Sequence, residues 1–311
     1  MALTSSDIAR IRADRGSSAL LFLTDRCPVE CAHCSVGSLR SGPGIADWPR
    51  FTSLVAGLAA HRRIRVVAIS GGDPFAERRG LSHAVRELSA AGKQLVLHTS
   101  GFFGAAGWAQ AVLRRSETVV LSTDRHHRAR LPDEVWLAAA RLIRACGAWL
   151  VVQSIDEDAD QAAELLRRAF GRGWAAWAEI VRQPGLPHGR GADWYRPVHA
   201  SSGERCALVG TPVVRYDGTV TACCNETVIT GGGPDRLRRK AATAGELHSA
   251  LDSLDDDPVL WAIGAAGPAA LRPGGGPDGI CAQCWRVLEH GTGSPAFTTA
   301  LRGLREGAHD L

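Results

Sequence analysis

Short apolar runs, several of them rich in β-branched residues, recur along the first part of the chain and predict buried strands. The stretches between them carry apolar residues at helical spacing, and two of these stretches end at glycines, Gly92 and Gly147. Amphipathic helices therefore alternate with buried strands. The six runs are Ala19–Leu23, Val66–Ile69, Gln94–Leu97, Thr118–Leu121, Trp149–Val152 and Ala178–Val181.

This alternation predicts an α/β fold with a parallel sheet and right-handed crossovers. Six strand–helix units favour a partial (β/α)6 TIM-like barrel over an open doubly wound sheet. The pattern breaks after residue 183 in the Pro- and Gly-rich segment QPGLPHGRGADW. We therefore divide the chain into an N-terminal extension (1–17), a barrel core (18–183), a linker (184–204) and a second module (205–311).

The second module is predicted to be a small α+β unit that contains a β-hairpin. The hairpin comprises Thr211–Tyr216, a turn at Asp217-Gly218 and Thr219–Cys223. A helix near Ala244–Leu254 and a loop over Pro268–Gly279 complete the module.

The chain has 311 residues, a formal net charge of +4 and a pI near 8.7. Its basic residues are scattered, which gives weak support for an anionic partner and none for nucleic acid. No apolar stretch approaches the roughly 20 residues of a membrane span, and the N-terminus has no signal-like apolar core. We expect a soluble, cytoplasmic protein with no membrane partner.

Nine cysteines in such a chain indicate metal or redox chemistry rather than disulfides. Cys27, Cys31 and Cys34 follow the first predicted strand at x3 and x2 spacings. One short loop can therefore place three thiolates around an iron–sulfur cubane and leave one iron without a protein ligand. A zinc site with a distant fourth ligand is the alternative.

The Cys-x3-Cys-x2-Cys motif resembles the signature of the radical S-adenosylmethionine (AdoMet) superfamily. The resemblance implies a [4Fe-4S] cluster whose open iron binds AdoMet, reductive cleavage to a 5′-deoxyadenosyl radical, and hydrogen abstraction from a substrate. It also implies a flavodoxin or ferredoxin-type electron donor. His33 stands where the family usually has an aromatic residue near the adenine.

Ser70-Gly71-Gly72-Asp73-Pro74 follows the second predicted strand. Glycines allow a close backbone approach, and Asp73 can accept a hydrogen bond from an ammonium group, although the same sequence also suits a strand-to-helix turn. The segment resembles the Gly-Gly-Glu-Pro element that contacts the amino group of AdoMet in the family, with Asp in place of Glu.

Polar residues also follow the other strands, where the carboxyl ends should line one pocket or cap helices. By resemblance, Ser122, Asp124 and Ser154 correspond to positions that touch AdoMet. His126-His127-Arg128 offers three cations that could hold an anionic or hydroxyl-rich substrate, and a histidine could remove an alcohol proton; a solvated loop is the alternative. The remaining strand-end groups are His98-Thr99-Ser100, Thr123, Gln153 and Arg182-Gln183.

Cys206, Cys223, Cys281 and Cys284 supply four thiolates, enough for a closed cluster or for zinc. Their arrangement, with a hairpin and a late Cys-x2-Cys, resembles the Twitch module, a shortened relative of SPASM domains that binds one auxiliary [4Fe-4S] cluster. Cys146 is expected to be a buried small hydrophobe. Cys224 is read as a buried thiol, an alternative ligand or a hydrogen-atom donor.

Three functions fit these motifs. The first is oxidation of a small polar metabolite, such as an alcohol or amino sugar, with the auxiliary cluster accepting one electron. The second is a peptide maturase that crosslinks or epimerises a ribosomally made precursor. The third is a non-catalytic zinc protein that binds a partner.

Overall fold

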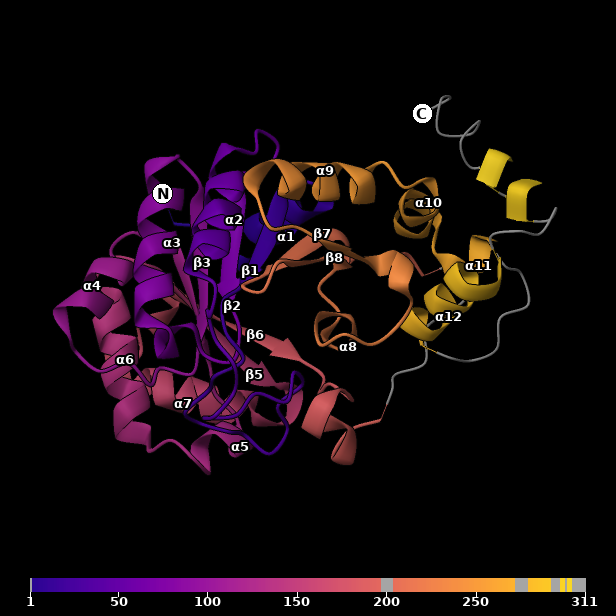
Figure 1. The fold of residues 1–311 in the computed structure, drawn as a ribbon. Helices are drawn as coiled ribbons and strands as arrows, with labels where there is room; N and C mark the ends of the chain where they lie inside the picture. Colours follow the sequence, from indigo (N-terminus) through magenta and orange to yellow (C-terminus); the bar gives the residue numbers. More distant parts are fainter. Residues whose placement is uncertain (1, 197–203, 272–278, 292–296, 300, 304–311) are drawn as a thin grey trace.

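The structure is a computed structural model that describes residues 2–196, 204–271, 279–291, 297–299 and 301–303. Its described part contains a nine-stranded sheet in the order β6-β5-β4-β3-β2-β1-β7-β8-β9 (Figure 1). All six strands predicted from the apolar runs are present, and most extend slightly beyond the predicted bounds. The strands are β1 (Ser18–Phe22), β2 (Val66–Ser70), β3 (Gln94–Thr99), β4 (Thr118–Ser122), β5 (Trp149–Ile155), β6 (Ala178–Gln183), β7 (Val209–Arg215), β8 (Thr219–Cys223) and β9 (Arg238–Lys240).

Strands β1 to β6 are parallel to their neighbours, and β6 and β9 form the two ends of the sheet. The strands do not close into a full barrel, as expected for a partial one, and the predicted partial (β/α) barrel is confirmed. One face packs against the crossover helices, and residues such as Val67, Leu97 and Leu121 belong to that main core. These helices are α2 (Trp48–Ala60), α3 (Arg78–Ala90), α4 (Gly107–Leu113), α6 (Asp133–Ala145) and α7 (Ala159–Phe170).

The opposite face of the sheet is covered in part by the N-terminal helix α1 (Ser5–Ala13). Strand side chains alternate between faces, so one valine from each of β2 to β5 faces this helix and forms a second, smaller core with Ile8 and Ile11. The Ser5 N–H donates to Glu179 of β6 at 2.7 Å, and the Thr118 hydroxyl of β4 donates to the Leu3 carbonyl at 2.6 Å. Helix α1 thus closes the inner face near the amino ends of the strands.

The C-terminal part continues the same sheet, because β7 pairs in parallel with β1 and antiparallel with β8. The predicted hairpin and the helix near residue 244 are confirmed. The loop predicted over Pro268–Gly279 is wrong at its start: Gly267 ends α10, and Pro268 opens α11, as suits a first helical position; residues 272–278 lie outside the described part. The C-terminal helices are α8 (Glu226–Ile229), α9 (Ala244–Asp255), α10 (Pro258–Ala266), α11 (Pro268–Leu271) and α12 (Ile280–Arg286).

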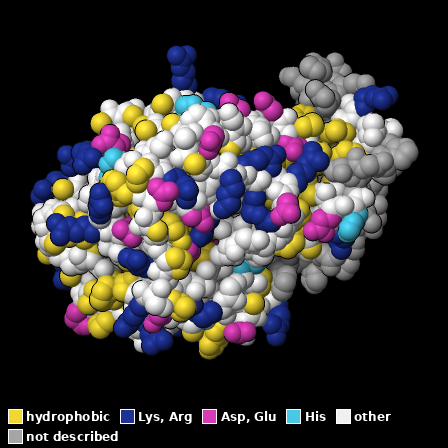
Figure 2. Space-filling view, viewed as in Figure 1, with side chains coloured by type: hydrophobic (Ala, Val, Ile, Leu, Met, Phe, Trp, Pro, Cys, Tyr) yellow, Lys and Arg dark blue, Asp and Glu magenta, His cyan; other side chains and the backbone are white. Residues whose placement is uncertain are grey.

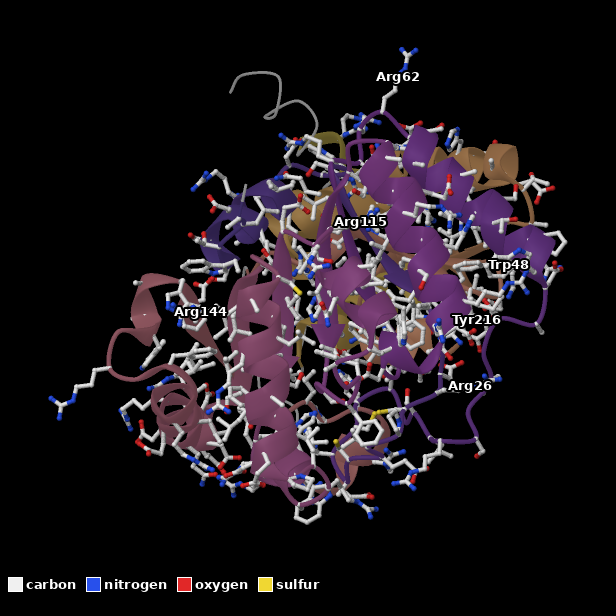
Figure 3. All side chains as sticks on the ribbon, turned by 90° about the vertical axis from the view of Figure 1, so that its left-hand side faces the viewer. Arg26, Trp48, Arg62, Arg115, Arg144 and Tyr216 are labelled. Atoms are coloured by element: carbon white, nitrogen blue, oxygen red, sulfur yellow. The ribbon has the colours of Figure 1, made fainter. Side chains whose placement is uncertain are left out.

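The surface carries mixed charge. On the face shown in Figure 2, Lys and Arg side chains are scattered among Asp and Glu instead of forming one basic patch. Arg62, after α2, extends outward from the surface in Figure 3. Across the described residues, we find no helix with the length and apolar character that a bilayer crossing requires.

Candidate functional site

The three N-terminal cysteines lie on one loop, residues 24–39, directly after β1; we call it the cysteine loop. The Cys27 N–H donates to the Leu39 carbonyl at 2.9 Å, which closes the loop on itself. Glu30 turns the chain with a positive φ of 52°, an uncommon conformation outside glycine. Cys27 and Cys31 are buried, Cys34 is half-buried, and all three are free thiols.

The Gly-Gly-Asp turn after β2 is joined to this loop by backbone hydrogen bonds. The Gly72 N–H donates to the Thr24 carbonyl at 2.6 Å, and the Asp73 N–H donates to the Arg26 carbonyl at 2.8 Å. A Cβ on Gly72 would lie 2.2 Å from the Arg26 carbonyl oxygen, and one on Gly71 would lie 2.6 Å from the Thr24 oxygen. Both glycines are therefore needed for the turn to pack against the cysteine loop.

Asp73 is buried and accepts hydrogen bonds from three residues. Its carboxylate receives the Phe75 N–H at 3.0 Å, the Ser100 N–H at 3.0 Å, the Ser100 hydroxyl at 2.6 Å and the Thr99 hydroxyl at 3.0 Å. Burial raises the pKa of Asp73, while these bonds oppose that rise. The carboxylate thus joins the ends of β2 and β3. A contact between this carboxylate and an ammonium group remains a prediction.

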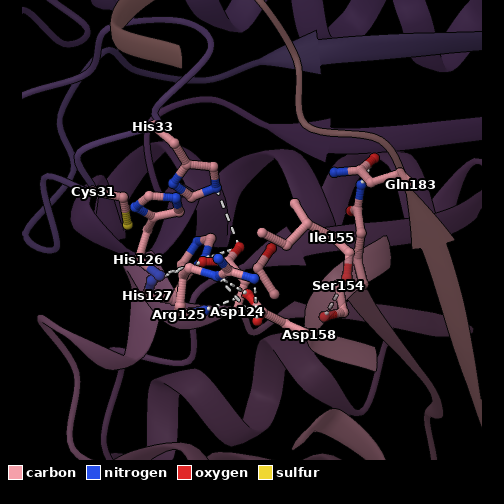
Figure 4. A network of polar contacts seen from close by, with 12 residues as sticks. Cys31, His33, Asp124, Arg125, His126, His127, Ser154, Ile155, Asp158 and Gln183 are labelled. Carbon is pink, nitrogen blue, oxygen red and sulfur yellow. Dashed lines mark hydrogen bonds and ion pairs between the residues drawn. The ribbon is translucent and has the colours of Figure 1, made fainter. Parts of the chain in front are cut away.

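Asp124, after β4, holds two imidazoles beside Cys31 (Figure 4). Its Oδ2 lies 2.7 Å from His127 Nδ1 and 3.2 Å from His33 Nε2. Its Oδ1 accepts the backbone N–H groups of His126 at 2.8 Å and His127 at 2.9 Å, which caps the short helix α5 (Arg125–Arg128). Burial favours the neutral acid, but the histidine hydrogen bonds lower the pKa of Asp124 below its ordinary value.

His127 completes a chain from Asp124 to Cys31. Burial lowers its pKa, but the hydrogen bonds to Asp124 and Cys31 outweigh burial and raise it above the ordinary value. Cys31, His33 and His127 each offer a ligand atom within 4.8 Å of the others. The buried Nδ1 atom of His33 has no hydrogen-bond partner among the described residues. This corner of the site can therefore accept a metal or a hydrogen-bond donor.

The other residues of the predicted histidine motif point in different directions. His126 is buried, stacks on His33 with ring centroids 4.4 Å apart, and places Nε2 3.0 Å from the Tyr195 hydroxyl. Arg128 is exposed and bonded to Asp133 at 3.0 Å. The structure therefore brings the two histidines to the cysteine loop and leaves Arg128 on the outer surface.

The two predicted serines, Ser122 and Ser154, offer little exposed surface to a ligand. Ser154 is buried, and its hydroxyl donates to the Ile155 carbonyl at 3.2 Å. The carbonyl of Ser122, which is half-buried, accepts the Trp136 indole N–H at 3.2 Å. A role for either hydroxyl in AdoMet binding remains a prediction.

The late cysteines gather where β8 and α12 meet. Cys223 and Cys284 are buried in the main core, and Cys206 packs against it. Burial raises the pKa of Cys223, Cys281 and Cys284, and repulsion between neighbouring cysteines adds to the rise: Cys206 acts on all three. Four thiolates in such a place require a compensating cation. The Asn225 side-chain amide also donates to Cys281 Sγ at 3.5 Å.

Of the two remaining cysteines, Cys146 lies apart from both sets, whereas Cys224 lies next to Cys223 of the late set and adds to the raised pKa of Cys223 and Cys281. Cys146 caps α6 and is half-buried, so the expectation of a buried side chain is wrong; its Sγ donates to the Gln110 carbonyl at 3.9 Å. Cys224 is half-buried as well, and its Sγ accepts from Arg12 of α1 at 3.5 Å.

Sequence reasoning missed five contributors to the site. Tyr195, Arg190 and Asn225 approach it from the segments after β6 and β8, and no motif marks them. Arg215, at the end of β7, donates to Asp25 of the cysteine loop at 2.7 Å, and the Tyr216 hydroxyl does so at 2.6 Å. Tyr216 and Arg26 lie on the same side of the molecule in Figure 3.

Neither cysteine set is as compact as a four-thiolate zinc site. Tetrahedral zinc with Zn–S bonds of about 2.3 Å would hold its sulfurs within about 4 Å of one another. Among the described residues, the one group of three or more ligand atoms within 4.8 Å is Cys31, His33 and His127.

Comparisons with known proteins address the fold. The structure of anSMEcpe with bound AdoMet and the Kp18Cys peptide aligns with 94% of this chain and 99% of its own, at a TM-score of 0.54 and 14% identity. Streptococcus suis SuiB bound to S-adenosylmethionine aligns with 80% of this chain and 67% of its own, at 0.55 and 12%. The chain shares the fold of these two AdoMet-bound proteins.

A second SuiB structure, bound to the precursor peptide SuiA, gives a TM-score of 0.54 at 11% identity, covering 82% of this chain and 69% of that one. The α/β fold predicted from the alternation of strands and helices is therefore confirmed. Neither a protein-family model nor a curated protein matches the chain.

Proposed function

We propose that the chain is a radical SAM enzyme that binds a [4Fe-4S] cluster through Cys27, Cys31 and Cys34 and AdoMet beside it. The observation that carries this proposal is the cysteine loop at the carboxyl end of β1, hydrogen-bonded to the Gly-Gly-Asp turn of β2. When reduced, such a cluster supplies the electron that cleaves AdoMet to a hydrogen-abstracting radical.

The chain's own residues position these groups. Gly71 and Gly72 keep side chains away from the loop, and Asp73 fixes the neighbouring strand ends. Asp124 orients His33 and His127 beside Cys31, where the imidazoles can contact the cluster or the adenine. His126, supported by Tyr195, is the histidine best placed to contact a substrate and accept its proton.

A second cluster is proposed at Cys206, Cys223, Cys281 and Cys284. A closed set of four ligands leaves no open iron, so this cluster would accept an electron from a substrate radical. The Asn225 hydrogen bond to Cys281 would adjust its reduction potential.

The comparisons favour a peptide substrate over a small metabolite. Two of the aligned structures hold peptides, Kp18Cys in anSMEcpe and the precursor SuiA in SuiB. We therefore place peptide maturation first, and oxidation of a small polar metabolite remains the second prediction for the same chemistry. A flavodoxin or ferredoxin-type donor is the proposed source of the electron.

Zinc binding is the competing function, because Cys31, His33 and His127 are close enough to share one ion. Metal analysis of the anaerobically reconstituted protein distinguishes zinc binding from iron–sulfur cluster binding. Two cubanes require about eight irons per chain and a visible absorption band. Stoichiometric zinc without iron would overturn the radical proposal.

Variants test the individual cysteines. Cys31→Ala should retain about four irons, in the second cluster, and form no 5′-deoxyadenosine. Cys281→Ala should still cleave some AdoMet yet yield no product from a peptide or metabolite. Cys146→Ala is the matched control and should behave as the parent does. Normal AdoMet cleavage by Cys31→Ala would refute the assignment.

A further inference from the structure

Residues 184–196, which follow β6, pack against the cysteine loop. Arg190 directs its guanidinium at two carbonyls of that loop. Its Nε and Nη2 lie 3.1 and 2.9 Å from the Cys31 oxygen, and Nη2 lies 3.0 Å from the Ser38 oxygen. The Arg190 backbone N–H also donates to the Cys34 carbonyl at 3.0 Å. One residue therefore holds the loop at three points.

The glycines on either side of Arg190 make this approach possible. Gly189 has a positive φ of 52°, and a Cβ there would lie 2.6 Å from the carbonyl oxygens of Cys34 and Ser35. A Cβ on Gly191 would lie 3.0 Å from the His33 oxygen and 2.3 Å from that of Leu186. Glycine on both sides therefore lets the backbone come close enough for the Arg190 guanidinium to reach the loop.

No carboxylate in the described part of the chain balances the charge of Arg190. Within the described residues, every hydrogen bond found for its guanidinium goes to a carbonyl, and no salt bridge to Asp or Glu is found. The side chain is half-buried, so water screens its charge less than that of a free surface arginine. A positive charge this close to Cys31 acts on whatever that thiolate binds.

We propose that Arg190 is a positioning residue for the cysteine loop: its guanidinium fixes the Cys31 and Ser38 carbonyls and makes a cluster bound there easier to reduce. The inference rests on the proposed function. Reduction adds one negative charge to the cluster, and a nearby cation stabilises that state, which raises the reduction potential. Fixing the carbonyls also keeps the loop closed around the metal.

Two substitutions of Arg190 separate the effect of its charge from the effect of its hydrogen-bonding geometry. Arg190→Gln removes both the charge and the fork of donors. Arg190→Lys keeps the charge, but an ammonium cannot reproduce the planar fork. Arg196→Gln is the matched control, because Arg196 belongs to the same segment, is exposed and, as far as the described residues go, has one hydrogen bond, to the Ala192 carbonyl at 3.3 Å.

The experiment uses anaerobically reconstituted full-length protein. Electron paramagnetic resonance during a redox titration gives the potential of the cluster whose signal changes on adding AdoMet, and incubation with an iron chelator gives its rate of loss. Arg190→Gln should titrate at a more negative potential and lose this cluster about tenfold faster, because charge-assisted hydrogen bonds are removed. Arg190→Lys should keep the potential near that of the parent but lose iron faster.

A parental potential and a parental rate of iron loss in Arg190→Gln would overturn the inference. If Arg190→Gln does not fold, Arg190→Lys provides the test. Iron loss from Arg190→Lys at the parental rate would also overturn the inference. Failure of the proposed function looks different: the parent would show no AdoMet-responsive signal, and Cys31→Ala would hold as much iron as the parent. That result would overturn both.

Discussion

Asp73 offers the sharpest test of how the site is held, because its buried carboxylate joins two strand ends. In Asp73→Asn one carboxylate oxygen becomes an amide nitrogen of nearly the same size. If the remaining oxygen keeps the Phe75 N–H, the new NH2 group faces the Ser100 N–H, and two donors then meet. The hydroxyls of Thr99 and Ser100 can rotate to accept, but the backbone N–H cannot.

The magnitude follows from these contacts. One buried, unsatisfied N–H costs about 1 to 3 kcal/mol, and the hydrogen bonds that remain lose their charge assistance. The variant also removes a buried charge, which offsets part of this cost. We expect the free energy of unfolding to fall by about 2 kcal/mol, close to a thirtyfold change in the folding equilibrium.

Chemical denaturation followed by circular dichroism measures this loss. Asp156→Asn is the control, since Asp156 is exposed and should change stability by less than about 0.5 kcal/mol. Equal denaturation midpoints for Asp73→Asn and the control would refute the view that this carboxylate holds β2 to β3.

Three further predictions concern other positions. Gly72→Ala places a Cβ 2.2 Å from the Arg26 oxygen, so the turn must move, and iron bound per chain after reconstitution should fall; unchanged iron would contradict this. Burial lowers the pKa of His98 to about 4, so this histidine stabilises the fold above its ordinary pKa of 6.5, and that stability, at most about 3 kcal/mol, is lost as pH falls toward 4. His98→Gln should therefore lose less stability than the parent between pH 7 and 5, and an equal loss would rule the effect out. Tyr195→Phe removes the hydroxyl beside His126 and should slow product formation while AdoMet cleavage continues; its stability should fall by no more than about 1.5 kcal/mol. An unchanged product yield would argue against a role for Tyr195.

The barrel could be predicted from sequence because its strands are short, continuous apolar runs and its helices have clear apolar faces. Val66 and Val67 illustrate the limit of that reasoning. Both are buried, yet one packs toward α1 and the other toward the crossover helices. A run that is apolar on both faces marks a buried strand but does not say what covers each face. The covering of the inner face by α1 therefore became visible only in the structure.

The cysteine ligands could be proposed for a similar reason, since their spacing is local, whereas the groups that hold their loop come from distant segments. The carbonyls of Arg26, Cys31 and Cys34 accept from Asp73 and Arg190, which lie many residues away. An irregular loop has no helix or strand partners for its backbone groups, so other elements must supply them. It follows that substitutions far along the chain should act on the cysteine loop as strongly as changes beside the cysteines themselves. The variants of Arg190 and Asp73 test that expectation most directly.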